Sequence, residues 1–221
     1  MNGDAEGAAD LYDVRFDAAE RRAKERVWQV LCEAFFQRFV DERAVVLDLA
    51  CGFGEFSRFI RAGRKLAVDA NPGVAALLPA GVEFMAGDAG DLSMLGDASI
   101  DVCFASNLFE HLPDRAAMDR VLAGVRRVLR PGGRFVVMQP NIKYAREAYW
   151  DFYDHVLPLS HLSAREAFLK HGFEIERLIP RFVPLSTKSA WPQHPALVRL
   201  YLGMPSLWRL FGKQFVIVAR K

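Results

Sequence analysis

The segment VVLDLACGFGEF, residues 45–56, decides the fold. It opens with a short apolar strand, and small residues follow at alternate positions: Ala50, Gly52 and Gly54. Glycines let the backbone turn sharply and approach a ligand closely. Asp48 places a carboxylate just before that turn, which suits a ligand with an amino group and would repel a pyrophosphate. The segment therefore predicts a strand, a ligand-binding turn and then a helix.

Strands and helices alternate on the C-terminal side of this turn. The expected strands are 65–69, 81–87, 99–106 and 134–140, and the expected helices are a short one near 91–95 and a long one over 114–129. Continuous apolar strands separated by helices are typical of parallel strands that are buried on both faces. Right-handed crossovers then predict a doubly wound α/β sheet.

The flanking segments fit one domain, residues 1–221. An amphipathic helix is expected over 18–40, within an N-terminal helical segment 1–43. Ser163 and Gly172 are predicted to begin and end a helix before a strand near 173–180. Residues 184–213 are expected to form a helical lid insertion, and 214–221 a last strand.

Composition and cysteine usage are those of a globular protein. The chain is 52% hydrophobic and 25% charged, and no apolar run reaches the roughly 20 residues that span a bilayer. The acidic start does not resemble a signal peptide. The three cysteines lie far apart, so neither a disulfide framework nor a metal site is expected. These features favour a cytoplasmic protein.

Charge is distributed unevenly along the chain. The net charge of +2 is too small to indicate a nucleic-acid partner. Residues 1–176 contain 21 Lys and Arg against 27 Asp and Glu, whereas residues 177–221 contain 8 Lys and Arg and no acid. A basic, apolar tail is compatible with an anionic acceptor or a lipid headgroup surface, and equally with a solvated edge.

Two further acids follow the next two expected strands. Asp69 ends the strand before ANP, where a carboxylate can accept both hydroxyls of a ribose. Asp88 follows the third strand, where an adenine amino group can donate to it. Either acid could instead cap a helix or turn. Since ligands bind at the carboxyl edge of such sheets, three acids at successive strand ends favour a binding site.

These motifs resemble the class I S-adenosylmethionine (SAM)-dependent methyltransferases, of the type 11 group, over residues 40–180. VLDLACGFGE (46–55) is similar to the first motif of the family, with Ala50 in place of the commoner glycine. SNLFEHLPD (106–114) and RVLRPGGRFVV (127–137) resemble the segments around strands 4 and 5. The resemblance implies a seven-stranded Rossmann-like sheet whose last strand is antiparallel.

The resemblance also implies which residues bind SAM and release S-adenosylhomocysteine. The residues implied are Asp48, Ala50, Gly52 and Gly54 for the methionine part of SAM, and Asp69 and Ala70 for its ribose. Asp88 and Ala89 are implied for the adenine, and Asn107 and Leu108 are implied to line the cofactor site. In similar enzymes the N-terminal segment, here with Tyr12 and Arg15, folds over SAM, and Arg15 could then pair with its carboxylate. The alternative is a frayed, solvent-exposed terminus. A narrower resemblance, in the flanks 12–16, 140–160 and 200–221, is to a bacterial subgroup associated with surface polysaccharides and glycolipids.

Methyl transfer to a hydroxyl needs a base, and histidine is the usual one. His155 follows an aromatic cluster where the acceptor should bind, and His111 follows strand 4 beside the expected methyl group. We therefore expect His155 as the base and His111 as the second candidate, with packing roles as the alternative. His161 is a weaker third, and His171 and His194 are expected at the surface.

The sequence thus predicts methyl transfer to a hydroxyl, or less readily an amine, of a sugar, glycolipid or natural product. The expected partner is this small acceptor, with peripheral membrane contact left open, and the protein is expected as a monomer or homodimer. One alternative is an NAD-dependent oxidoreductase, although the spacing Gly52-x-Gly54-x-x-Ser57 only half matches a dinucleotide motif. Another is a methyltransferase-like binding protein without catalysis.

Overall fold

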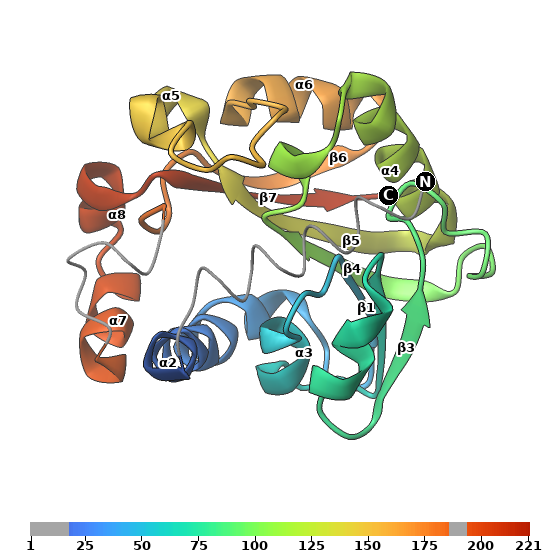
Figure 1. The fold of residues 1–221 in the computed structure, drawn as a ribbon. Helices are drawn as coiled ribbons and strands as arrows, with labels where there is room; N and C mark the ends of the chain where they lie inside the picture. The colour runs from blue at the N-terminus through green and yellow to red at the C-terminus, as the bar shows by residue number, and fades with distance from the viewer. Residues whose placement is uncertain (1–17, 186–193) are drawn as a thin grey trace.

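Seven strands form one mixed sheet at the centre of the protein (Figure 1). The computed structural model describes residues 18–185 and 194–221. The strands are β1 (Val45–Leu49), β2 (Arg64–Asp69), β3 (Val82–Ala86), β4 (Ile100–Ser106), β5 (Leu129–Pro140), β6 (Glu174–Ile179) and β7 (Gln214–Arg220). Their order is β3-β2-β1-β4-β5-β7-β6, and among these described strands β7 runs in the direction opposite to the other six, antiparallel to both β5 and β6. The predicted doubly wound sheet with an antiparallel last strand is confirmed.

The strand order reverses between β1 and β4. After β1 the chain adds β2 and β3 on one side, and then β4 returns to pair with the other side of β1. The loops that leave β1 and β4 therefore diverge, which opens a crevice at the carboxyl edge of the sheet. This crevice lies where the sequence places the glycine turn.

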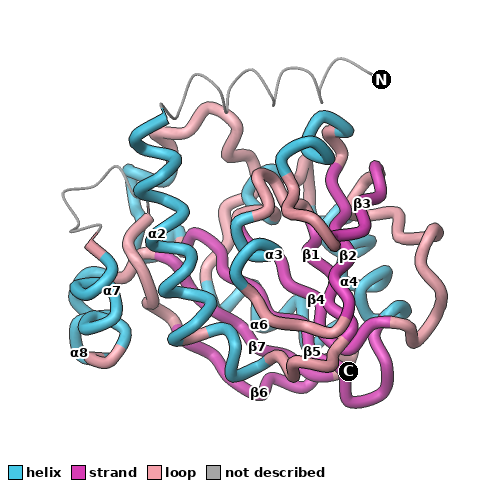
Figure 2. The backbone as a smooth tube through the Cα atoms, turned by 90° about the horizontal axis from the view of Figure 1, so that it is seen from below, coloured by secondary structure: helices cyan, strands magenta, loops and turns pink. Residues whose placement is uncertain are grey.

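Helices cover both faces of the sheet. The described helices are α2 (Ala18–Ala34), α3 (Glu55–Phe59), α4 (Arg115–Val128), α5 (Ile142–Ala145), α6 (His161–Lys170), α7 (Pro195–Leu202) and α8 (Pro205–Phe211), with 3-10 turns η1 (Phe36–Phe39), η2 (Pro72–Leu77), η3 (Phe109–His111) and η4 (Arg146–Tyr149). Alternate strand residues enter two cores, because side chains of a strand point to opposite faces. One core contains α4 and α6, and the other contains α2, α7 and α8 (Figure 2).

Three local predictions need correction. No helix forms near 91–95, because Asp91 accepts a hydrogen bond from the Ser93 amide and the segment makes turns instead. The first helix ends at Ala34, and a 3-10 turn continues to Phe39. Helix α6 is capped by Ser160, whose hydroxyl accepts from the Ser163 amide, and Ser163 supplies the reciprocal bond of a capping box.

The segment between β6 and β7 contains α7 and α8, as far as it is described. Tyr201 of α7 donates its hydroxyl to the carbonyl of Phe182, and Trp208 of α8 donates its indole N–H to the carbonyl of Tyr201. Arg199 forms an ion pair with Glu33 of α2 at 2.8 Å. These contacts join the insertion to α2 and to the sheet. Within the described ranges, no helix is both long and apolar enough to cross a membrane.

Candidate active site

A cavity of about 180 Å³ lies at the carboxyl edge of β1 and β4. The glycine turn, the end of β4, α2, α7 and the segment 152–155 all contribute to its wall. Apolar side chains make up most of this wall, including Trp28, Phe56 and Phe104; the rings of Phe56 and Phe104 stack at 3.8 Å. The cavity thus combines an apolar body with polar groups from the strand ends.

The backbone of the turn after β1 is shaped for close approach. Ala50, Gly52 and Gly54 all have positive φ, at 54°, 50° and 70°. A Cβ atom added to Gly52 would meet nothing within 4 Å, whereas one added to Gly54 would lie 2.3 Å from Cδ2 of Leu78. The space beside Gly52 is therefore open to a ligand, whereas a side chain at Gly54 would require the Leu78 side chain to move.

Asp48 and Asp69 hold the turn in place. Asp48 is buried and accepts hydrogen bonds from the amide and the hydroxyl of Ser57, at 3.2 and 2.7 Å. Burial raises the pKa of Asp48 to about 7, against the effect of these two bonds. Asp69 accepts from the amides of Gly52 and Asn71, both at 2.9 Å. A carboxylate offers about four acceptor positions, so Asp69 keeps capacity for ribose hydroxyls.

The predicted cofactor residues fall into two groups. Asp48, Ala50, Gly52 and Asn107 line the cavity. Gly54, Asp69, Ala70, Asp88, Ala89 and Leu108 lie outside its wall, in the segments that follow β1, β2, β3 and β4. Asp88 accepts from the Gly90 amide at 2.6 Å, so the capping alternative holds for one of its oxygens.

The end of β4 leaves polar atoms for a ligand. Asn107 has a φ of 52°, and its Oδ1 is buried without a hydrogen-bond partner among the described residues. The same holds for Oγ of Ser106 and for both carboxylate oxygens of Glu110. Backbone strain and unsatisfied polar groups gather at ligand sites. These atoms indicate that the cavity is built to receive hydrogen bonds from a bound molecule.

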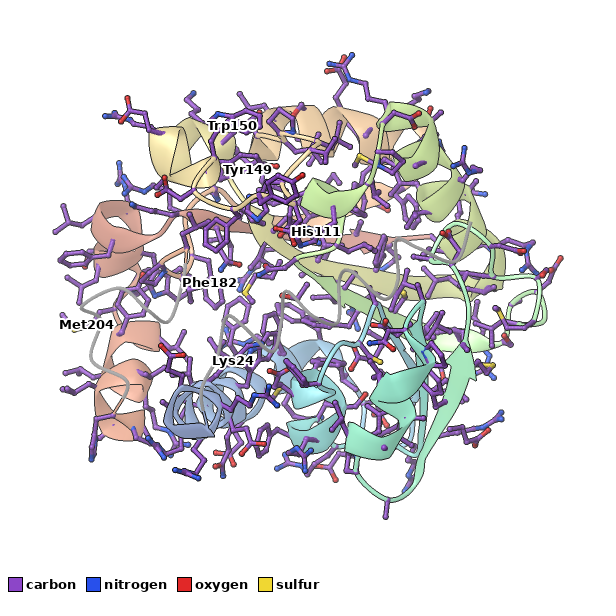
Figure 3. All side chains as sticks on the ribbon, in the orientation of Figure 1. Lys24, His111, Tyr149, Trp150, Phe182 and Met204 are labelled. Atoms are coloured by element: carbon purple, nitrogen blue, oxygen red, sulfur yellow. The ribbon has the colours of Figure 1, made fainter. Side chains whose placement is uncertain are left out.

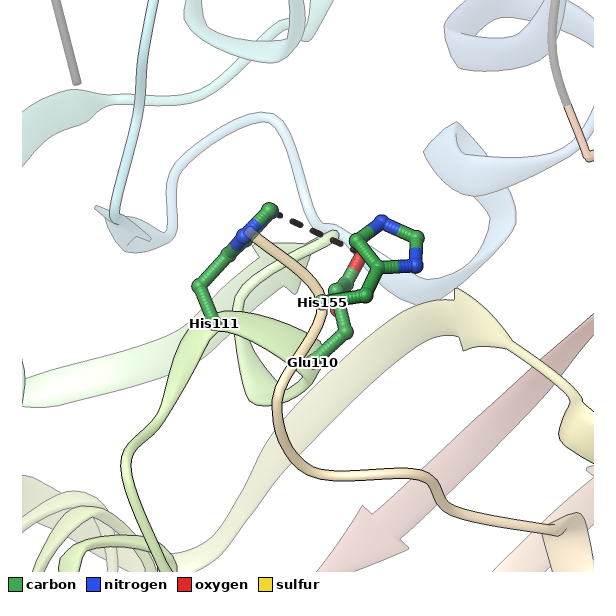
Figure 4. A group of neighbouring side chains, drawn as sticks. All are labelled: Glu110, His111 and His155. Carbon is green, nitrogen blue, oxygen red and sulfur yellow. Dashed lines mark ion pairs between the residues drawn. The ribbon is translucent and has the colours of Figure 1, made fainter. Parts of the chain in front are cut away.

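His111 and His155 come together at this end of the cavity (Figure 4). Their rings meet edge to face, with centroids 5.4 Å apart. Nδ1 of His111 lies 3.1 Å from the carbonyl oxygen of Asp154 and 3.3 Å from its Oδ2. Because both neighbours are acceptors, Nδ1 carries the proton, and Nε2 of His111 is left as the basic nitrogen. Asp154 therefore orients His111, although it precedes His155 in the sequence.

Glu110 is a functional candidate that the sequence reasoning missed. Its side chain is 2% exposed, and Oε1 lies 3.9 Å from Nε2 of His111. Burial raises the pKa of Glu110 to about 8. Glu110 follows the end of β4, just as the three acids identified from the sequence lie at or after the ends of β1, β2 and β3. Extending the search for acids at strand ends to β4 would have found it. Ligand atoms of Glu110, His111 and His155 lie within 4.8 Å of one another, a geometry that a metal ion can use.

The aromatic residues of 144–153, which form the cluster before His155, and the remaining histidines divide between the cavity wall and positions outside it. Phe152 lines the cavity and stacks on His155 at 4.7 Å. Tyr149 is buried and donates its hydroxyl to the Leu157 carbonyl, whereas Trp150 and Tyr153 are exposed (Figure 3). The remaining candidates outside the cavity wall are Tyr144, which lies under Arg181, His161, which is bonded to Asn141, and the helix-end residues His171 and His194. Tyr12 and Arg15 lie outside the described residues.

The insertion contributes apolar groups and one amide to the site. Val198 and Tyr201 of α7 line the cavity, together with Gln214 at the start of β7. The Gln214 amide nitrogen donates to the carbonyls of Pro184 and Leu185, which turns Oε1 away from them. The sequence also allows the basic tail to bind an anionic acceptor, but its residues Arg199 and Arg209 do not line the cavity.

This sheet, with a glycine turn after β1 and acids at or after the ends of β2 and β3, has the Rossmann-like fold of methyltransferases. Residues 47–137 match the family model described as a methyltransferase domain. The "Probable S-adenosylmethionine-dependent methyltransferase" of Mycolicibacterium smegmatis is 34% identical over 126 residues, which cover 54% of this chain and 48% of the relative. The chain thus spans about half the length of this curated relative.

Solved structures share the fold. A chain of the complex between the Haloferax volcanii Trm112 methyltransferase activator and its methyltransferase superposes with a TM-score of 0.64 at 22% identity, covering 92% of this chain and 94% of that one. A SAM-dependent methyltransferase from Archaeoglobus fulgidus gives a TM-score of 0.61 at 20% identity, with coverage of 84% and 90%. The match of residues 47–137 to a methyltransferase domain favours this class over the NAD-dependent alternative, and the solved structures show that the sheet as a whole has the same fold.

Proposed function

We propose that the protein transfers the methyl group of SAM to a hydroxyl of a small molecule, with His111 as the general base. One observation carries this proposal: His111 lines the same cavity as the glycine turn, and Asp154 fixes its tautomer. A base oriented by a carboxylate is the arrangement expected for removing a proton from a weakly acidic group.

The turn after β1 and the strand ends supply the groups that would hold SAM. The open space beside Gly52 and the buried, unpartnered Oδ1 of Asn107 fit its methionine part. We assign its full site to Asp48, Ala50, Gly52, Gly54, Asp69, Ala70, Asp88, Ala89, Asn107 and Leu108. The acids of this set match the donors of SAM, namely an ammonium, two ribose hydroxyls and an adenine amine.

When bound, SAM supplies an electrophilic methyl group on a sulfonium that leaves readily. The protein then has to position the acceptor and remove its proton. Nε2 of His111 accepts the hydroxyl proton, while Asp154 stabilises the imidazolium that forms. The apolar wall around Trp28 and Phe104 excludes water from this step. A positioned general base contributes about 10²–10⁴-fold in rate.

His155, which the sequence predicts as the base, becomes the second candidate in this proposal. Its ring is stacked on Phe152 and tilted against Tyr149, with centroids 4.7 Å away in each case. This packing fixes the imidazole beside His111, where it can hold the acceptor by a hydrogen bond. We therefore place His111 first as the base, because Asp154 bonds to His111.

The acceptor we propose is a hydroxyl of a sugar, a glycolipid or a natural product. Buried oxygen atoms of Glu110 and Gln214 that lack a hydrogen-bond partner among the described residues suit a molecule that brings several hydroxyl groups. An amine acceptor is the second candidate, because a bound ammonium would satisfy the carboxylate of Glu110.

The cysteines Cys32, Cys51 and Cys103 are buried and unbridged, which supports a location in the reducing cytoplasm.

The test starts with calorimetry of S-adenosylhomocysteine binding and with an assay for its formation from SAM. Nucleotide sugars, glycolipid extracts and phenols serve as acceptors. With any active acceptor, His111→Ala should lower kcat by about 10²–10⁴-fold and leave cofactor affinity unchanged. Asp154→Asn should lower kcat less. Full activity of His111→Ala with loss in His155→Ala would exchange the two roles, and absence of cofactor binding would overturn the proposal.

A further inference from the structure

The outer side of the insertion exposes a group of large apolar side chains. We call it the α7–α8 apolar face: Leu197, Leu200, Met204 and Leu210, with exposed fractions of 46%, 59%, 41% and 65%. Leu197 and Leu200 are three residues apart, which places them on one side of α7, and Met204 lies between α7 and α8. Both views put α7 and α8 at the periphery of the molecule, with Met204 at its outer edge (Figures 1–3). Exposed apolar groups gathered in this way mark an interaction surface.

The same part of the chain carries only positive charge. Residues 177–221 contain eight Lys and Arg and no Asp or Glu, although an even spread of the 27 acids would place about five there. Arg209 and Lys213 lie on and just after α8, beside the apolar face. Arg199 forms an ion pair with Glu33, which partly neutralises its charge. The partner of this surface should therefore be both apolar and anionic.

The two sides of α7 have different neighbours. Val198 and Tyr201 line the cavity, while Leu197 and Leu200 are exposed. A helix is about 10–12 Å across with its side chains, so a molecule on the outer side lies within that distance of the acceptor pocket. A partner bound to the apolar face would thus be close to the site of methyl transfer.

We propose that the α7–α8 apolar face docks on an anionic phospholipid surface and brings the cavity to an acceptor held in that membrane. Only the part of this inference that concerns the acceptor rests on the proposed function; the docking itself does not. A second copy of the chain fits less well, because a twofold contact would bring this cationic patch against itself. An anionic bilayer instead accepts the leucines between its headgroups and neutralises Arg209 and Lys213.

The experiment is co-sedimentation of the full chain with vesicles of phosphatidylglycerol and phosphatidylcholine in equal amounts. The wild-type protein should bind these vesicles, bind pure phosphatidylcholine vesicles weakly, and dissociate as salt rises. Leu200→Gln with Leu210→Gln should lower binding at least about tenfold, and Arg209→Glu with Lys213→Glu should remove its dependence on phosphatidylglycerol.

Helix α6 offers the matched control. Leu162 and Leu169 are exposed to similar degrees, 53% and 43%, so Leu162→Gln with Leu169→Gln should leave binding unchanged. Wild-type protein that ignores phosphatidylglycerol vesicles, or equal losses in the α6 control, overturns the inference. So does a dimer in solution that Leu200→Gln with Leu210→Gln converts to monomers. Calorimetry with S-adenosylhomocysteine on the same variants tests the proposed function separately.

Discussion

Asp154 shows what a single side chain can do that its place in the sequence does not reveal. It precedes His155, yet its carboxylate lies against His111, 43 residues earlier in the chain. The acids after β1, β2 and β3 were predictable, because each ends or closely follows an apolar strand. The pairing of Asp154 was not, since it depends on how the segment 150–157 folds back on η3, through bonds from the Val156 and Leu157 amides to the Glu110 carbonyl.

Glu110 makes the stability of the protein depend on pH. Its pKa of about 8 in the folded state exceeds the ordinary glutamate value of 4.5, so the folded state keeps a proton that the unfolded state has lost between these values. The free energy of unfolding should therefore fall as pH rises from about 5 to 8, by up to about 1.4 kcal/mol per pH unit from this group. The pKa of Asp48 is likewise raised, to about 7, so Asp48 also lowers the free energy of unfolding as pH rises.

Urea unfolding at several pH values checks this prediction. Glu110→Gln should flatten the decline, while Glu166→Gln on the exposed side of α6 should keep it. A wild-type stability that rises from pH 5 to 8 with the same slope in Glu110→Gln would contradict it.

Asp69 should govern cofactor affinity. Asp69→Asn retains an acceptor for the Gly52 amide but removes the charge that would hold two ribose hydroxyls. We expect a loss of about 1.5–3 kcal/mol, which is roughly 10- to 150-fold in the Kd for S-adenosylhomocysteine measured by calorimetry. Asp119→Asn, on the surface of α4, is the control. Unchanged affinity in Asp69→Asn would remove Asp69 from the cofactor site.

Among the elements, the long ones were predictable and the short ones less so. Strands and the helix over 114–129 have strong apolar patterns, and the structure places them within a few residues of expectation. The segment near 91–95 has few residues between glycines, so turns closed by Asp88 and Asp91 replace a helix there. Ser160 and Ser163 are both good N-cap residues. The extended backbone at Ser160 makes this residue the N-cap of α6.

The glycine turn offers a matched pair of substitutions. Both Gly52→Ala and Gly54→Ala force an alanine into a left-handed conformation, at a cost of about 1–2 kcal/mol each. Gly54→Ala adds a clash with Leu78, so it should lower the melting temperature more. Gly52→Ala places a methyl group in the open space and should weaken S-adenosylhomocysteine binding more. Thermal unfolding and calorimetry measure the two effects, and equal effects of both variants on both readouts would contradict the assignment.

At the scale of the whole molecule, the insertion and the sheet are joined through one core. Trp208 packs against Phe35 and Phe182, with ring centroids 5.9 and 5.1 Å away. The sequence predicts a helical insertion over 184–213, but it does not say which face of the sheet the insertion covers. The structure packs Tyr201, Leu202 and Trp208 against α2, because Phe35 and Phe182 provide aromatic partners there, and leaves Leu197, Leu200 and Leu210 exposed.

Trp208→Ala should therefore lower the local stability of the insertion and leave that of the sheet unchanged. A truncation of this size in a core costs about 3–5 kcal/mol, here concentrated on α7 and α8. Hydrogen exchange should become faster at amides of α7 and α8, while amides of β1 and β4 stay protected. Leu210→Ala, at an exposed position of the same helix, is the control, and uniform acceleration across the sheet would contradict this view.

The position of β7 has a consequence for synthesis on the ribosome. Strand β7 lies between β5 and β6, and β6 has no other neighbour among the described strands. While the chain emerges, β1 to β5 can pair in turn, but β6 must wait until β7 has left the ribosome. A nascent chain stalled before Gln214 would carry β6 and the insertion as unpaired apolar segments, which is the state that chaperones capture. The sheet is therefore completed late, because β6 can join it only after residues 214–220 have been made.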